Sequence, residues 1–120
     1  MAWLVTNHED FDPEYDALSP EVQDELLAMM GLLAEVGPKL GRPHADTLNG
    51  SKHANMKELR FAAAGGVWRA AFAFDPERKA VLLAIGDKSG VAERRFYKGL
   101  IARADRRFDD HLAALARGKE

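Results

Sequence analysis

The sequence predicts one small domain that combines helices with an antiparallel β-meander, and three observations predict it. Its 120 residues suffice for one hydrophobic core but not for two, so we expect a single domain over residues 1–120. One stretch carries apolar residues at helical spacing behind a clear helix start. Further along, three short apolar runs are separated by tight-turn residues, which is typical of consecutive antiparallel strands.

The first 38 residues predict a strand and two helical segments. Residues 3–6 are strand formers, and residues 11–17 predict a short helix or turn. Ser19 is a favoured N-cap, Pro20 a favoured first helical residue, and Glu21 places an acid in the first turn. Gly37 and Pro38 end this helix. Its buried stripe is expected at Val22, Leu26, Met29, Leu33 and Val36.

The rest of the chain predicts a loop, a meander and a long helix. Residues 40–54 are rich in Gly, Pro, Asn, Asp and Ser, and are expected to form a loop. Strands are expected at residues 56–63, 67–74 and 80–86, joined by Gly65-Gly66 and by residues 75–78. One face of the C-terminal helix is expected to carry Phe96, Leu100, Ile101, Ala104, Phe108, Leu112 and Leu115.

Charges are sorted along the chain. Residues 1–38 contain nine acids and no Lys or Arg, whereas residues 39–107 contain fifteen Lys/Arg and seven Asp/Glu, a net of 15 − 7 = +8. The overall net charge of −2 hides this asymmetry. A basic field of this size attracts polyanions, and charge sorting of this kind indicates a nucleic-acid or membrane partner.

Strand parity indicates where the basic residues point. With two- or four-residue loops between the strands, Arg60 shares a face with Arg69, and Arg69 shares its face with Ala84, Gly86 and, if pairing continues, Lys88. The opposite face then collects Leu59, Phe61, Trp68, Phe72, Phe74, Val81, Leu83 and Ile85 as a hydrophobic core face. Facing like charges destabilise a sheet by up to about 1 kcal/mol. The convergence therefore favours an anionic partner; the alternative is that the arginines only pair with acids, Arg60 with Glu58.

Composition excludes several classes of protein. The chain has no cysteine, so disulfides and thiolate chemistry are excluded. Its four histidines show no paired spacing, and we expect no metal and no cofactor. The N-terminus lacks a basic segment followed by a long apolar run, which argues against a signal peptide. No stretch approaches transmembrane length, so we expect no membrane association and a cytoplasmic location.

An ordered series of segments resembles the phage-derived, HigB-like branch of the RelE toxin superfamily. It begins with Leu40-Gly41-Arg42-Pro43-His44-Ala45-Asp46-Thr47-Leu48, Gly50-Ser51-Lys52 and Met56-Lys57-Glu58-Leu59-Arg60. It continues with Trp68-Arg69, Phe72-Ala73-Phe74-Asp75-Pro76, Gly86-Asp87-Lys88, Arg95-Phe96-Tyr97 and Ala104-Asp105-Arg106. The similarity covers essentially the whole chain, and the series is far more specific than any one segment.

The resemblance implies a compact α+β fold of the RelE type. N-terminal helices would pack on one face of a small, mainly antiparallel sheet, a long helix would end the chain, and the other face would bind RNA. It also implies the toxin of a type II toxin–antitoxin system, with an antitoxin partner that often carries a helix-turn-helix domain. The family activity is metal-free endonucleolytic cleavage of mRNA, usually on the ribosome; DNA would be met only through the antitoxin complex.

The resemblance also assigns catalytic roles. Metal-free cleavage by 2′-OH attack needs a base, cations for the phosphorane and an acid for the 5′ oxygen. Arg69 matches the family's central-strand arginine and is the first choice for the phosphate, because a guanidinium binds it bidentately. Lys88 could neutralise the leaving oxygen, Arg60 would bind backbone phosphate, and Tyr97 could stack on a base or transfer a proton.

Other residues are expected around these four. Relatives place lysines on the active face of the first meander strand, where this chain has Met56 and Glu58. Glu58 could be a general base, but a partner role for Arg60 is favoured, because flanking arginines stabilise its charged form. His53 is a further candidate, since some relatives use histidines. RNA-binding cations are expected at Lys52, Lys57, Arg94, Arg95 and Lys98, although parity turns Lys57 away from the active face.

Two other functions stay open at this point. One is a non-catalytic toxin of the same fold that inhibits DNA gyrase, as ParE does. The other is a phage-derived protein that binds nucleic acid or a partner and cleaves nothing. Fold alone does not separate these functions from an mRNA nuclease, because function depends on the site.

Overall fold

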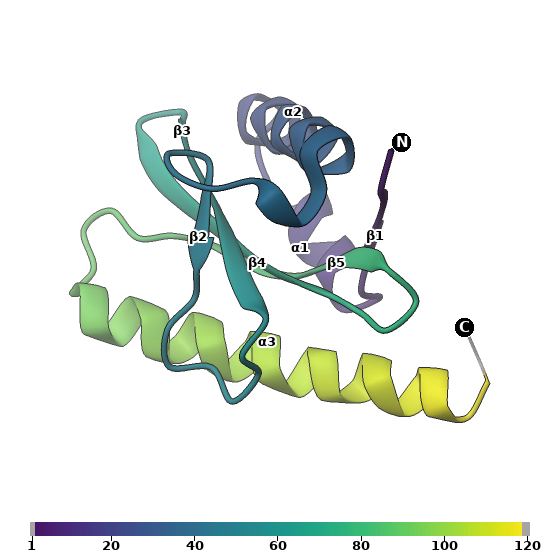
Figure 1. Ribbon diagram of the computed structural model, residues 1–120. Coiled ribbons are helices and arrows are strands. Elements are labelled where there is room, and N and C mark those ends of the chain that lie inside the picture. Colours follow the sequence, from purple (N-terminus) through teal and green to yellow (C-terminus); the bar gives the residue numbers. More distant parts are fainter. Residues whose placement is uncertain (1, 119–120) are drawn as a thin grey trace.

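The computed structural model describes residues 2–118 and has the α+β architecture expected (Figure 1). Its five strands form one sheet in the order β1-β5-β4-β3-β2. In chain order the elements are β1 (Leu4–Asn7), α1 (Phe11–Asp16), α2 (Pro20–Val36), the 3-10 turn η1 (Gly37–Lys39), β2 (Ala45–Thr47), β3 (Met56–Ala63), β4 (Gly66–Phe74), β5 (Lys79–Asp87) and α3 (Glu93–Ala116). None of the helices in the described part of the chain is long and apolar enough to span a membrane.

Helix α2 begins and ends where the sequence predicts. The Ser19 hydroxyl accepts a hydrogen bond from the Val22 amide at 3.4 Å, and Pro20 is the first helical residue. At the other end, Gly37 takes a φ of +73°. A Cβ at that position would overlap the Trp3 indole. Gly37 is therefore required both by its backbone conformation and by the close approach of the N-terminal segment.

Helices cover both faces of the sheet (Figure 1). Helices α1 and α2 pack on one face through Phe11, Val22, Leu26, Met29 and Leu33. Helix α3 packs on the other through Leu100, Ala104 and Phe108. The N-terminal helices thus pack on one face, as expected. Helix α3 covers part of the face that was expected to bind RNA, because the strands also carry apolar side chains toward α3, namely Met56, Ala71, Ala73, Val81, Leu83 and Ala84.

The register of the meander explains two errors in the expected core face. Phe74 pairs with Ala80 and Phe72 with Leu82, but Ala71 pairs with Ala84, so the register shifts at Leu83. Val81 and Leu83 consequently lie under α3, not on the α1/α2 side. The cause is the 75–78 loop, in which Arg78 takes a φ of +67° and the Asp75 amide bonds to Lys79. Beside this loop, the numbers of two paired residues add to an even value, as for Phe74 with Ala80. Beyond the bulge they add to an odd value, as for Arg69 with Gly86, which is the register that parity predicts.

The two outer strands differ in how well the sequence predicts them. β2 pairs antiparallel with β3 inside residues 40–54, so the prediction of a loop over that whole segment is wrong in part. It has only three residues, which is too short for an alternating pattern to be recognised. β1 is present as predicted, and it pairs parallel with β5.

Candidate functional site

The site is built around two arginines on neighbouring strands. Arg60 on β3 and Arg69 on β4 are direct cross-strand partners, as parity predicts. Arg69 in turn faces Gly86 on β5. A Cβ on Gly86 would lie 2.9 Å from Phe96 of α3. The missing side chain therefore allows the first turn of α3 to rest on the end of β5, which brings the next residue, Tyr97, over the arginines.

A buried carboxylate joins these elements. Glu58 on β3 is 3% exposed. Its Oε2 accepts from Arg60 Nη1 at 2.8 Å, and its Oε1 accepts from the Tyr97 hydroxyl at 2.8 Å. The same hydroxyl accepts from Arg69 Nε at 3.2 Å. The partner role favoured for Glu58 is thus present in the structure, and Glu58 also binds the tyrosine.

The hydrogen-bond pattern fixes the state of Tyr97. Burial raises the pKa of the Tyr97 hydroxyl, and the hydrogen bond to Glu58 raises it further, while Arg69 acts in the opposite direction. Tyr97 is therefore a neutral phenol that donates to Glu58 and accepts from Arg69. A phenol that donates to a carboxylate can give that proton up while its oxygen accepts another from a bound group.

Lys88 completes the cationic group at the end of β5. Its Nζ lies 5.9 Å from the centroid of the Tyr97 ring and 2.9 Å from Glu93 Oε1. The preceding residue holds this segment, since Asp87 Oδ1 accepts from the Val67 amide at 3.0 Å and from the Ser89 amide at 2.9 Å. Hydrogen bonds from Ser89 lower the pKa of the Asp87 carboxyl.

A cavity of about 350 Å³ opens over this group. Its lining consists of Arg42, Asp46, Thr47, Leu48, Asn49, Glu58, Arg60, Lys88, Glu93 and Tyr97. Arg69 is 6% exposed and is not among the lining residues. The cations that face the cavity are therefore Arg60, Lys88 and Arg42, whereas Arg69 lies behind Tyr97 and contacts its hydroxyl.

The cavity contains residues to which the sequence assigned no role. Asp46 and Asn49 lie on or next to β2, and Arg42 pairs with Asp46 at 2.8 Å. Glu93 pairs with Lys88, and this contact lowers the pKa of the Glu93 carboxyl. Residues 40–48 belong to the family resemblance, and that resemblance could have indicated Arg42 and Asp46 as site residues. Their position beside Arg60 depends on the pairing of β2 with β3.

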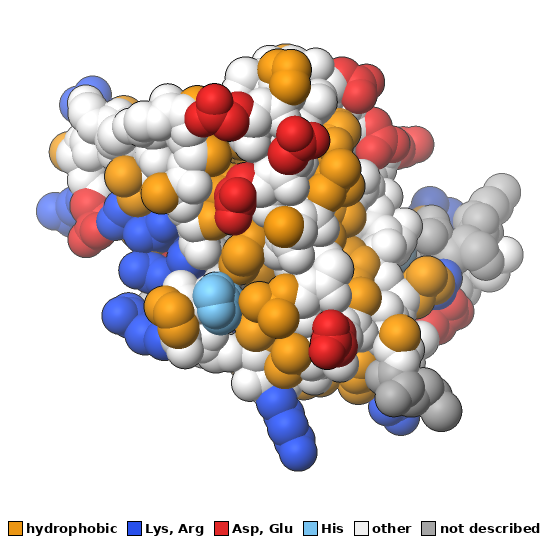
Figure 2. All heavy atoms as spheres, turned by 90° about the horizontal axis from the view of Figure 1, so that it is seen from above, with side chains coloured by type: hydrophobic (Ala, Val, Ile, Leu, Met, Phe, Trp, Pro, Cys, Tyr) orange, Lys and Arg blue, Asp and Glu red, His pale blue; other side chains and the backbone are white. Residues whose placement is uncertain are grey.

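The remaining candidates lie elsewhere. Lys57 is on the opposite face of β3, where its Nζ donates to the Pro38 carbonyl at 3.0 Å. Lys52 pairs with Asp109, and His53 Nε2 lies 2.8 Å from the same carboxylate. The cations Arg94, Arg95 and Lys98 are on the first turns of α3, outside the cavity lining. Figure 2 shows the molecule from above. Lys and Arg side chains gather at the left edge, the end of the molecule where α3 begins, while acidic side chains are spread over the face toward the viewer.

Comparisons with known proteins give relatives of this chain in both sequence and structure. The family model for the phage-derived Gp49-like proteins matches residues 13–109. Two Mycobacterium tuberculosis proteins named as candidate toxins are similar: HigB2 is 43% identical over 99 residues, and HigB3 is 44% identical over 98 residues. The chain belongs to the phage-derived Gp49-like family, and these HigB proteins are its relatives.

The extent of the similarity differs between the relatives of this Gp49-like chain. Each match covers 82% of the chain, but it spans about half of HigB2 (49%) and most of HigB3 (83%). Among solved structures, a double arginine-to-alanine variant of Escherichia coli toxin RelE in the free state matches with a TM-score of 0.61. That match covers 85% of this chain and 96% of the other at 16% identity, and it shows that the two share a fold.

Proposed function

We propose that this protein is the toxin of a type II toxin–antitoxin pair and that it cleaves mRNA with its own side chains, on the translating ribosome. The observation that carries the proposal is the chain of hydrogen bonds from Arg69 through the Tyr97 hydroxyl to Glu58, beside Arg60 and Lys88. The similarity to proteins named as HigB toxins supports the toxin role. This role requires a cognate antitoxin, and we expect that antitoxin to carry a helix-turn-helix domain.

The arrangement suits attack by a ribose 2′-OH on the adjacent phosphorus. In this step the 2′-OH proton passes to the Tyr97 oxygen while the Tyr97 proton passes to Glu58 Oε1. The phosphorus–O2′ bond forms and the phosphorus–O5′ bond breaks. Lys88 gives a proton to the departing O5′. The products are a 2′,3′-cyclic phosphate and a 5′-hydroxyl end.

Each remaining residue has a role that follows from its position. Arg60 faces the cavity and stabilises the charge that develops on the phosphorane oxygens. Arg69, buried behind Tyr97, holds the phenol in place and adds positive potential. Glu58 replaces the strand lysines of relatives and is the final proton acceptor. Arg94, Arg95 and Lys98 extend the positive surface along α3 for contact with the RNA backbone.

The test is to induce the chain in cells and to map new RNA ends together with plasmid supercoiling. We expect breaks inside translated codons that carry 5′-hydroxyl ends, with supercoiling unchanged. Breaks with 5′-phosphate ends would exclude 2′-OH attack. Loss of supercoiling without mRNA breaks would instead support a ParE-like inhibitor of gyrase.

A further inference from the structure

The charged residues around the candidate active site are already paired with one another. The lining of the cavity of about 350 Å³ contains three ion pairs of 2.8–2.9 Å, namely Arg60 with Glu58, Arg42 with Asp46 and Lys88 with Glu93. Positive and negative side chains are therefore equal in number. An entering phosphate can compete for these cations, but contacts to phosphate carry no information about the base sequence. Any reading of a base must come from other groups in the cavity.

The neutral polar residues of the lining are Tyr97, Thr47 and Asn49. The Tyr97 hydroxyl is occupied by its two hydrogen bonds. Thr47 is the cross-strand partner of Lys57, so alternation along β2 turns its side chain toward the face on which Lys57 lies. Asn49 is exposed, and its side-chain amide makes no hydrogen bond within residues 2–118. Asn49 therefore offers a free donor and a free acceptor at this cavity.

The backbone is held in place on both sides of Asn49. Before it, the Leu48 amide donates to the Met56 carbonyl at 3.0 Å, and the Leu48 side chain is buried. After it, Gly50 takes a φ of +101°, and a Cβ there would lie 3.3 Å from Ile101 Cδ1 of α3. The glycine thus supplies the left-handed turn and lets the loop rest against α3.

The next three residues of the loop bind α3 through two of its carboxylates. Ser51 Oγ donates to Asp105 Oδ1, and the Lys52 amide donates to Asp105 Oδ2 at 3.2 Å. Lys52 Nζ contacts the Asp109 carboxylate, and His53 Nε2 lies 2.8 Å from Asp109 Oδ1. The connection between β2 and β3 accordingly reaches down to α3 (Figure 1). A loop fixed in this way costs less to order when a ligand binds to it.

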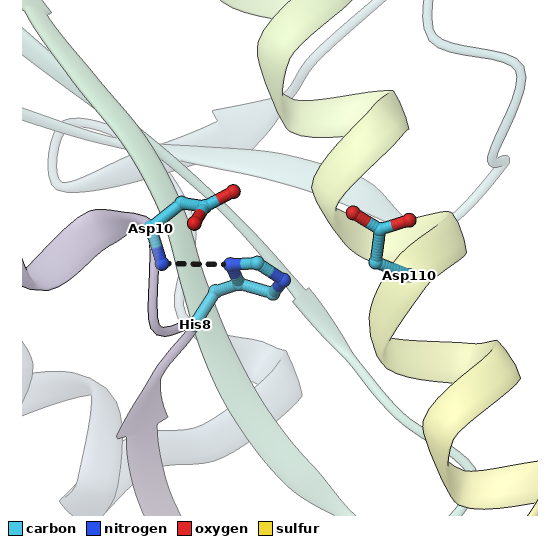
Figure 3. Close-up of side chains that lie close together, drawn as sticks. All are labelled: His8, Asp10 and Asp110. Carbon is cyan, nitrogen blue, oxygen red and sulfur yellow. Dashed lines mark hydrogen bonds between the residues drawn. The ribbon is translucent and has the colours of Figure 1, made fainter.

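The opposite end of α3 is unsuited to RNA. There His8 lies beside the carboxylates of Asp10 and Asp110 (Figure 3). The neighbouring cavity is lined by further acids, and Arg117 is the one Lys or Arg of its lining. Carboxylates repel phosphate groups, so the strand of RNA is expected at the cavity that Asn49 lines.

The geometry points to a base-reading group, and we propose that Asn49 hydrogen-bonds the edge of an RNA base next to the scissile phosphate and so sets the base preference of the site. An amide presents a donor beside an acceptor, and the unstacked bases of single-stranded RNA are read through such pairs on their edges. Because the bases differ in where these groups lie, an amide at a fixed position favours some bases over others. The inference rests on the RNA binding proposed for this cavity, but it does not require cleavage.

The test measures base selectivity with RNA that cannot be cleaved. The 2′-O-methyl homotrinucleotides of A, C, G and U are titrated separately into the full-length, ¹⁵N-labelled chain. We expect the tightest and the weakest to differ roughly fivefold or more in affinity, the discrimination typical of one amide–base pair. Asn49→Ala should bring the four affinities together. Asn55→Ala, in the same loop but outside the lining of this cavity, should keep the wild-type ratio.

Two outcomes would overturn the inference: no base selectivity in the wild-type chain, and selectivity that Asn49→Ala leaves unchanged. If Asn49→Ala alters the spectrum throughout the chain, the isosteric Asn49→Asp takes its place, and an unchanged ranking of the four trinucleotides would equally overturn it. Mapping RNA ends in cells separates this inference from the nuclease proposal. Selective binding without mRNA breaks would refute cleavage alone, whereas breaks whose base preference survives Asn49→Ala would refute the role of Asn49 alone.

Discussion

The Tyr97 hydroxyl donates to Glu58 across 2.8 Å and so connects the first turns of α3 to the middle of β3. The two residues are 39 positions apart and lie in two separate segments of the family resemblance. In the mechanism that we propose, this hydrogen bond carries the proton of Tyr97 to Glu58.

Removal of the Tyr97 hydroxyl should stop cleavage and leave the fold intact. Tyr97→Phe keeps the ring packed against Phe96 but breaks the hydrogen bonds to Glu58 and Arg69. We expect the rate of RNA cleavage to fall about 10²–10⁴-fold, the usual contribution of general acid–base catalysis. Tyr15→Phe in α1 is the matched control and should cleave normally. Full activity in a folded Tyr97→Phe variant would exclude Tyr97 from the reaction.

Neutralising Glu58 should make Tyr97 easier to ionise. Burial and the Glu58 carboxylate together raise the pKa of the Tyr97 hydroxyl above its ordinary value of 10.0, so Glu58→Gln should lower that pKa. Tyr15 and Tyr97 are the two tyrosines of the chain. In a Tyr15→Phe background, phenolate absorbance therefore reports Tyr97 alone. A titration midpoint that stays the same or rises in the Glu58→Gln protein would contradict the coupling.

Cations on the start of α3 should bind RNA, whereas the cation on the far face of β3 should not. Arg94→Glu together with Arg95→Glu should weaken RNA affinity and lower the magnitude of its log–log salt slope by about 0.7 for each phosphate that is no longer neutralised. Lys57→Glu should have little effect, because Lys57 lies on the opposite face and donates to Pro38. Fluorescence anisotropy with a labelled RNA at several salt concentrations measures both. A larger effect of Lys57→Glu would reverse this assignment.

Asp87 should contribute to stability above its pKa and lose that contribution in acid. Hydrogen bonds from Ser89 hold the pKa of its carboxyl below the ordinary value of 3.8. The folded state therefore binds this proton less readily than the unfolded state, and the stabilisation disappears as the pH falls below 3.8 through the folded pKa. Asp87→Asn should lower stability by about 1–2 kcal/mol near neutral pH and by less in acid. Urea unfolding at several pH values measures this, with Asp24→Asn as control; an equal loss at every pH would refute the assignment.

Gly37 should tolerate no side chain, in contrast to a glycine earlier in α2. Gly37→Ala places a Cβ on the Trp3 indole at a φ of +73°, and should cost roughly 2–4 kcal/mol of unfolding free energy. Gly31→Ala lies in α2, where the added Cβ would meet no atom within 4 Å, and should stabilise the helix by up to about 1 kcal/mol. Thermal melting of both variants decides the matter. Equal melting temperatures would show that Trp3 does not pack there.

Local features of the sequence determined most of the elements and part of the site. The Ser19-Pro20 start, the Gly37 end and the turns between strands depend on residues close together in the chain, so their chemistry can be read from it directly. The pairing of Arg60 with Arg69 is of this kind, because a two-residue turn sets the register of the strands on either side. The family resemblance supplied the RelE-like fold and directed attention to Tyr97.

Only the tertiary structure decided which side chains meet across the chain. The bulge at Leu83 places Val81 and Leu83 under α3. It follows from the register that the 75–78 loop sets, and that loop includes the left-handed conformation of Arg78. The packing of α3 on the second face of the sheet brings Tyr97 to Glu58, and the pairing of the short β2 brings Asp46 to the same cavity. These contacts join residues far apart in sequence. They form only when the helices and strands of the whole domain pack together, so a pattern within a short segment cannot predict them.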